Sequence, residues 1–153
     1  MNVYLVQHAY AKSEQEDPER PLSEKGWADI RKIADFVFKK GNISIKEIFH
    51  SGKMRARQTA EVLAQKLNSI VKEADGLKPM DDPFIWAERL RKINEDIMLV
   101  GHLPHLSRLT SILLCQDAEK ILVEFQQGCV VCLKTEEFSN WSLSWMVIPN
   151  IID

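Results

Sequence analysis

Short apolar runs alternate with amphipathic segments through the first two-thirds of this chain, and that alternation is the strongest constraint on its fold. Each run is only long enough for a strand and is bounded by polar residues, glycine or proline. These runs predict strands at Asn2–Gln7, Ile45–His50, Ile70–Glu73 and Ile97–Val100. The segments between them predict helices from a Ser23 N-cap to about Lys40, where Gly41 ends the helix, and over residues 54–67, 84–93 and 103–114.

The last third of the chain changes to strand patterns alone, at residues 121–125, 129–134 and 141–148. Alternating strands and helices imply a parallel sheet with helices on both faces, whereas consecutive strands favour antiparallel pairing. We therefore expect an α/β fold, a three-layer α/β/α sandwich with a mostly parallel central sheet and antiparallel C-terminal strands. No linker or low-complexity tract divides the sequence, so we expect residues 1–153 to form a single domain.

The charge balance narrows the possible partners. The chain has 20 basic and 22 acidic residues, a formal net charge of -2, which gives no electrostatic reason to expect nucleic acid or a membrane surface as a partner. No apolar stretch is long enough to span a membrane and the first residues lack a secretory signal pattern, which favours a cytoplasmic location. Structural disulfides are not expected among three cysteines in such a chain.

Two patterns that resemble binding motifs have simpler structural interpretations. Cys129 and Cys132 have metal-site spacing, but on a strand they point to opposite faces, so we expect two core thiols instead of a metal site. The four tryptophans are expected to be packing residues. Trp141 and Trp145 would share one strand face, where an exposed partner surface is the alternative.

Chemically useful residues follow three of the predicted parallel strands. Gln7-His8 ends the first strand, His50-Ser51 ends the second and precedes Arg55, and Gly101-His102 ends the fourth. Ligands of open α/β sheets bind at the carboxyl ends of the strands, where the following helix N-termini favour anions. Arginine binds phosphate oxygens and a neutral imidazole can attack phosphorus. The pattern predicts phosphoryl transfer with His8 as the nucleophile.

Other polar residues near these strand ends fit structural roles better. His105 is expected on a helix surface, with a metal pair with His102 as the less favoured alternative. His50 is expected in the core or on the surface, with a position at the rim of the binding pocket as the alternative. Asp82 precedes a predicted helix and is expected to cap it, although Asp81 or Asp82 as a general acid remains an alternative. No glycine-rich nucleotide loop is present in the sequence.

Four segments of the chain resemble the SixA-type phosphohistidine phosphatases of the histidine phosphatase (phosphoglycerate mutase-like) superfamily. They are Val3–Ala9, similar to the family's opening strand and Arg-His-Gly motif; Arg20–Gly26; Ser51–Ala60; and Val100–Pro104. Their order and spacing also match, over most of the chain to about residue 114. The resemblance implies a phosphoglycerate mutase-like fold.

The resemblance also implies roles for individual residues. His8 would attack phosphorus and carry a phosphohistidine intermediate, Arg55 would bind the phosphoryl oxygens, and His102 would stabilise the transferring group. Arg20 would contact phosphate or substrate, and the positions of Gln7, Ala9 and Leu103 would also line the substrate site. No metal or other cofactor is implied, because cationic side chains and backbone amides would neutralise the phosphoryl charge.

The sequence departs from the family at the nucleophile motif. Gln7 replaces the family's arginine and Ala9 its glycine, while Gly52 replaces a proline. The change at Gln7 removes a fixed charge and a fork of donors. Either the Gln7 amide contacts phosphate and Arg20 or Lys12 supplies charge, or catalysis is weakened.

The implied function is a metal-independent phosphohistidine phosphatase whose substrate is carried on a signalling or phosphotransfer protein. A phosphoramidate bond to histidine has a better leaving group than a sugar alkoxide, so a general acid matters less. Two alternatives remain open: an attenuated or non-catalytic phosphate-dependent binding module, and a phosphatase for small phosphomonoesters. The sequence does not predict an oligomeric state.

Overall fold

A six-stranded sheet organises the fold in a computed structural model that describes residues 1–137 and 139–152. The strands are β1 (Asn2–Gln7), β2 (Glu47–His50), β3 (Ile70–Glu73), β4 (Ile97–Gly101), β5 (Val130–Thr135) and β6 (Trp141–Val147). The helices are α1 (Glu24–Lys40), α2 (Met54–Leu67), α3 (Phe84–Leu90) and α4 (His105–Cys115), and a 3-10 turn follows at Pro149–Ile151. None of the helices in this described part of the chain has the length and apolarity to cross a membrane.

The strand order is β3-β2-β4-β1-β5-β6, which places β1 between a parallel and an antiparallel neighbour. β1, β2, β3 and β4 run parallel, as the strand–helix alternation predicts, and β5 and β6 pair antiparallel at one side. This arrangement confirms the expected mostly parallel sheet with antiparallel C-terminal strands. It also brings the carboxyl ends of β2, β4 and β1 side by side.

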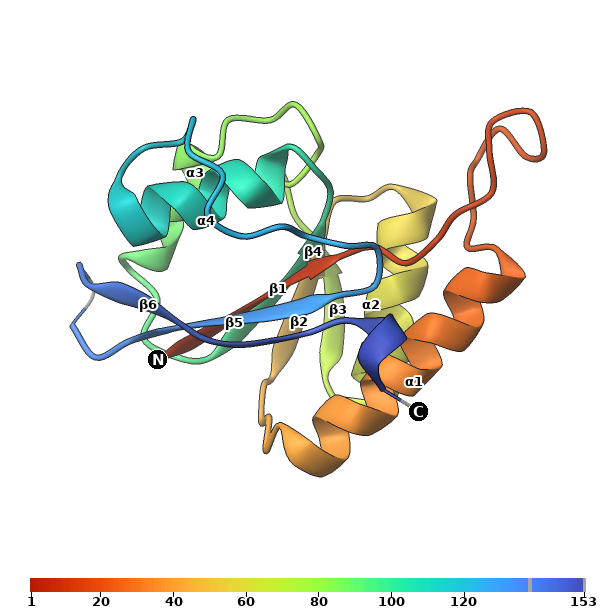
Figure 1. Ribbon diagram of the computed structural model, residues 1–153, viewed down its shortest axis with the longest axis horizontal. Coiled ribbons are helices and arrows are strands. Elements are labelled where there is room, and N and C mark those ends of the chain that lie inside the picture. The colour runs from red at the N-terminus through yellow and green to blue at the C-terminus, as the bar shows by residue number, and fades with distance from the viewer. Residues whose placement is uncertain (138, 153) are drawn as a thin grey trace.

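Helices cover the sheet on both faces (Figure 1). α1 and α2 pack on one face, over a core that includes Tyr4 and Val6 of β1. α3 and α4 cover the other face, where Val3 and Leu5 belong to a second core cluster. Alternate β1 side chains therefore enter different cores, which is why the strand is apolar throughout.

Local sequence signals account for the boundaries of α1. The Ser23 hydroxyl accepts a hydrogen bond from the Gly26 amide at 3.1 Å, satisfying an N-terminal donor, and Gly41 follows the last helical residue. Apart from the strand expected at residues 121–125, the other predicted elements are present with small differences at their ends: β2 begins two residues late, α3 ends at Leu90, and α4 begins at His105.

The predicted strand at residues 121–125 is wrong. The segment has no strand structure, yet Val123 and Phe125 are buried while Ile121, Leu122 and Glu124 are exposed. The alternation of buried and exposed side chains is therefore present, but it arises because Val123 and Phe125 pack against the core beneath α3 and α4. The segment comes just before β5 in the chain. Because β5 is already paired with β1 on one side and β6 on the other, the segment cannot pair with β5.

The expectation that Trp141 and Trp145 share a face is also wrong. Cys132 pairs with Trp145 and Leu133 pairs with Leu143, so β6 contains one extra residue at this point. Such a bulge reverses the side-chain alternation beyond it. Trp141 packs against the α3–α4 core, and Trp145 packs against the α1–α2 core with its ring 5.9 Å from that of Tyr4.

Cys129 and Cys132 are buried in different cores, on opposite faces of the sheet, as the strand pattern predicts. Burial raises the pKa of each thiol to about 11. Both are therefore protonated at neutral pH and behave as small apolar side chains.

Candidate functional site

The carboxyl ends of β1 and β4 bring two histidines together. Gln7 pairs with Gly101, and the His8 amide continues the ladder by donating to the Gly101 carbonyl at 3.0 Å. His102 directly follows the last residue of β4, and its ring centroid lies 5.0 Å from that of His8. Parallel pairing thus places residues that are far apart in the sequence side by side.

His8 is held in one orientation by its own backbone. The ring Nδ1 lies 2.7 Å from the Ala9 carbonyl, and because a carbonyl only accepts, Nδ1 carries the hydrogen. The lone pair is then on Nε2, and no hydrogen bond to this nitrogen is found among the described residues. Burial lowers the pKa of His8 to about 4, with Arg55 and Arg20 contributing, so the ring is neutral at pH 7.

His102 is almost fully buried at 2% exposure, and its Nε2 lies 2.6 Å from the Ser51 hydroxyl oxygen. Burial, followed by the charges of His8 and Arg55, lowers the pKa of His102 to about 2. Its Nδ1 is buried and makes no hydrogen bond within the described part of the chain.

Arg55 lies in the first turn of α2, which begins just after β2, and brings positive charge to the same edge. Its Nε is buried without a partner in residues 1–137 and 139–152. Burial and the nearby Arg20 lower the pKa of Arg55. Arg55 and the two imidazoles therefore lie at one edge of the sheet, where the buried Arg55 Nε and His102 Nδ1 lack partners among the described residues. Such unpaired polar atoms beside a positive charge suit the binding of an oxyanion.

Arg20 lies in the loop between β1 and α1, which projects away from the body in Figure 1. The loop closes on itself, since the Lys12 amide donates to the Pro21 carbonyl at 2.8 Å and the Arg20 Nε donates to the Lys12 carbonyl at 3.0 Å. Arg20 has a positive φ of 50°. Burial is the main cause of the lowered pKa values of His8 and Arg55, and the charge of Arg20 contributes to both.

Gln7 and Ala9 flank the nucleophile position within the core. Ala9 is fully buried, and Gln7 is 7% exposed with its Oε1 lacking a donor among the described residues. A half-turn of the amide would present Nε2 at that position, where it would donate to an anion. The Gly128 amide donates to both the Gln7 and His8 carbonyls, at 3.0 and 3.1 Å, and so fixes this segment from the β5 side.

Leu103 and His105 follow His102 but occupy different environments. Leu103 is 38% exposed and lies at the surface of the turn before α4. The expectation of a surface His105 is wrong, because its ring is fully buried beside Gly76 and near Asp81. Leu109 and Ile112 share its helix face, and this spacing could have revealed the burial.

The family of the chain follows from residues 3–82, which match the model of the histidine phosphatase superfamily (branch 1). That segment is more than half of the chain and contains the first two of the strand ends described above. The chain belongs to this superfamily. No curated protein matches the sequence at a significant level.

Solved structures similar to this histidine phosphatase show the same fold. A protein histidine phosphatase SixA complexed with tungstate matches with a TM-score of 0.85, 21% identity, and 98% of each chain covered. A proposed SixA phosphohistidine phosphatase from Agrobacterium tumefaciens matches at 0.77, with 24% identity over 97% of each chain. A proposed α-ribazole-5'-P phosphatase from Escherichia coli matches at 0.81, with 15% identity over 97% of this chain and 98% of that one.

The two carboxylates considered as general acids have structural contacts. Asp82 accepts a hydrogen bond from the amide of Phe84, the first residue of α3, at 3.0 Å, although the N-cap residue of this helix is Pro83 and not Asp82 as expected. Asp81 accepts from the Lys78 amide, also at 3.0 Å. His50, 5% exposed, accepts from the Gly52 amide at 3.0 Å and so lies in the core, as expected.

Two hydroxyl residues that support the site were not recognised from the sequence. The Ser51 hydroxyl contacts His102, and Thr59 links the backbone after His8 to α2. Both contacts join residues about 50 positions apart, so no local pattern indicates them. Their only sequence signal is their presence in the segment that resembles the family.

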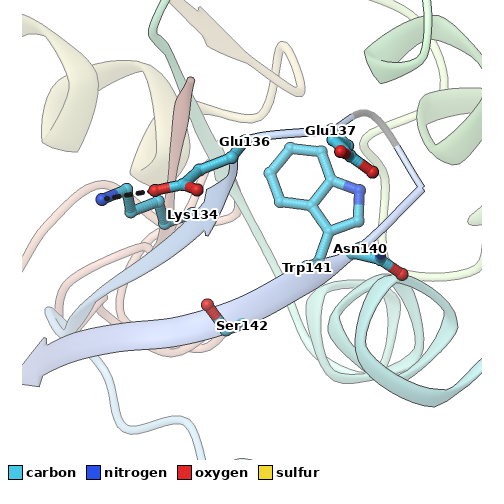
Figure 2. Close-up of a pocket in the computed structure, with 6 residues that line it drawn as sticks. All are labelled: Lys134, Glu136, Glu137, Asn140, Trp141 and Ser142. Carbon is cyan, nitrogen blue, oxygen red and sulfur yellow. Dashed lines mark ion pairs between the residues drawn. The ribbon is translucent and has the colours of Figure 1, made fainter.

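A separate hollow of about 500 Å³ lies at the β5–β6 connection (Figure 2). It is lined by Lys134, Glu136, Glu137, Asn140, Trp141 and Ser142, and Lys134 forms an ion pair with Glu136. Lys134 pairs with Asn2 at the start of β1, whereas His8 follows its end. The hollow is therefore at the opposite edge of the sheet and shares no residue with the histidine site.

Proposed function

We propose that the chain is a phosphatase that hydrolyses protein phosphohistidine through a covalent intermediate on His8. The observation that carries the proposal is the His8 tautomer: Nδ1 is engaged by the Ala9 carbonyl, and the Nε2 lone pair is free. A low pKa keeps this nitrogen unprotonated at neutral pH, so it is available to attack phosphorus.

In the first step, His8 Nε2 forms a bond to phosphorus, the bond from phosphorus to the partner's imidazole breaks, and the released imidazole nitrogen takes up a proton from water. Arg55 and His102 have buried donors without protein acceptors in the described residues, and they would hold the phosphoryl oxygens. Arg20 adds charge from the loop side. Water then attacks the phosphorus on His8, releasing inorganic phosphate and restoring the free imidazole.

The leaving group makes phosphohistidine a suitable substrate. The imidazole of a phosphoramidate departs more readily than an alkoxide, so the step depends less on a general acid. Asp81 and Asp82 are engaged by backbone amides on the α3 side. The structural similarity to a SixA protein complexed with tungstate, an oxyanion, also supports the proposal. We propose a cytoplasmic phosphotransfer or signalling protein as the partner.

A phosphorylated histidine phosphotransfer domain tests the proposal directly. Wild-type protein in EDTA is expected to release phosphate and to form an acid-labile phosphoryl adduct, whereas His8→Ala and His8→Asn do neither. Equal turnover by wild type and His8→Asn would overturn the role of His8. A panel of sugar phosphates run in parallel separates this function from a small-molecule phosphatase, which would turn over the panel faster than the phosphoprotein.

The replacement of arginine by Gln7 supports one alternative, a phosphate-dependent binding module. Its amide carries no charge, and its Oε1 has no donor among the residues described. That module would bind the phosphorylated partner more tightly than the unphosphorylated one without turnover. Adduct formation on His8 followed by phosphate release would exclude it.

A further inference from the structure

Ser51 is one of the most deeply buried polar residues, at 1% exposure, and its hydroxyl joins β2 to His102. The oxygen accepts a hydrogen bond from the Lys53 amide at 3.3 Å and lies 2.6 Å from His102 Nε2. The same turn is fixed on its other side, since the Gly52 amide donates to His50 Nδ1 at 3.0 Å. The position of the hydroxyl is therefore set by the backbone that follows β2.

The direction of the hydrogen bond to His102 follows from counting protons. The Lys53 amide can only donate to the Ser51 oxygen, so the Ser51 proton still requires an acceptor. His102 Nε2 is the sole acceptor that this proton has among the described residues, and a buried hydroxyl proton without an acceptor is costly. Ser51 thus donates to Nε2, and the neutral ring carries its own hydrogen on Nδ1.

We propose that Ser51 is a positioning residue that holds His102 as its Nδ1–H tautomer and directs that N–H to the phosphoryl group. His102 Nδ1 is buried and has no protein acceptor in the described part of the chain, so its hydrogen is available to a phosphoryl oxygen. The ring lies next to that of His8, where the phosphoryl group would be transferred. The tautomer of His102 is inferred from the hydrogen bonds alone, whereas its role in phosphoryl transfer rests on the proposed function.

The tautomer can be measured without any substrate by ¹⁵N NMR of histidine-labelled protein at pH 7, with His102→Gln assigning the signal. Wild type is expected to show a protonated Nδ1 and an unprotonated Nε2 at His102. Ser51→Ala is expected to shift His102 toward the Nε2–H form, and Ser51→Thr, which keeps the hydroxyl, is expected to retain Nδ1–H. A protonated Nε2 in the wild type, or an unchanged tautomer in Ser51→Ala, would overturn the inference.

The kinetic arm measures phosphoryl transfer from the phosphohistidine domain to His8 by rapid quench. Ser51→Ala is expected to lower the transfer rate about 10- to 100-fold, and Ser51→Thr to recover most of it. Unfolding curves identify any variant that is merely destabilised. If Ser51→Ala or Ser51→Thr fails to fold, Ser51→Cys, whose side chain has a similar size, is used in its place. A shifted tautomer with an unchanged transfer rate would refute the positioning role, whereas the expected NMR result with an inactive wild type would refute only the proposed function.

Discussion

The Thr59 hydroxyl accepts a hydrogen bond from the Ala9 amide at 3.1 Å, joining the residue after His8 to helix α2. The same hydroxyl donates to the Arg55 carbonyl at 2.7 Å, one helical turn earlier. Thr59 is fully buried, so neither contact is replaced by water when it is lost. One side chain therefore sets the distance between the proposed nucleophile and the helix that carries Arg55.

Replacing Thr59 with valine removes both hydrogen bonds but preserves the shape of the side chain. The Ala9 amide would be left buried without an acceptor, which typically costs about 1–3 kcal/mol of stability. We expect Thr59→Val to lower phosphoryl transfer to His8 about tenfold, because misplacement of reacting groups slows the reaction. Thr59→Ser keeps the hydroxyl and should remain close to wild type in transfer; equal transfer by the valine variant would contradict this role.

Arg20 is expected to provide the positive charge that the residue at position 7 lacks. Burial is the main cause of the lowered pKa values of His8 and Arg55, and the guanidinium of Arg20 contributes to both. Arg20→Ala should lower kcat/KM by about 10²-fold, typical of losing a donor to a transition-state oxyanion. Gln7→Arg in the Arg20→Ala background should recover much of that loss. A double-mutant cycle measures this coupling, and strict additivity of the two changes would refute the compensation.

Most of the sheet could be predicted because the two central parallel strands, β1 and β4, are continuous apolar runs. The details that could not be predicted depend on pairing. The extra residue in β6 that separates the faces of Trp141 and Trp145 has no local signature. The segment 121–125 has a strand's alternation, but whether such a segment pairs depends on the neighbours already in the sheet. Sequence patterns report which side chains are buried more directly than they report hydrogen-bond partners.

The convergence of His8, His102 and Arg55 could be predicted from the rule that parallel strands end at the same edge. Their catalytic roles remain predictions. The buried position of His105 is indicated by its spacing to Leu109, but its place at the start of a helix favoured the surface instead. The Ser51 contact with His102 required the order of β2 and β4 in the sheet, which the sequence alone does not specify.

Gly26 is expected to be required by the close approach of α1 to the loop after His8. A Cβ added at Gly26 would lie 2.0 Å from the Tyr10 carbonyl oxygen, a backbone atom that cannot move alone. Helix propensity alone predicts that Gly26→Ala stabilises the protein by about 1 kcal/mol. The contact instead predicts destabilisation of about 1–3 kcal/mol, as for overpacked cores. Denaturant unfolding shows whether Gly26→Ala raises or lowers the free energy of unfolding. Ala28→Gly, on the exposed face of α1, measures the effect of helix propensity alone.

The buried histidines predict that the protein loses stability in weak acid. His8 has a pKa of about 4 when folded, against about 6.5 for an unfolded histidine, so between these values only the unfolded chain binds the proton. The free energy of unfolding should therefore rise with pH across that window and carry the full His8 contribution above pH 6.5. Each such histidine adds a slope of about 1.4 kcal/mol per pH unit. Urea unfolding at pH 4.5 to 6 should show a slope smaller by about that amount in His8→Asn, and an unchanged slope would mean that His8 titrates normally in the folded protein.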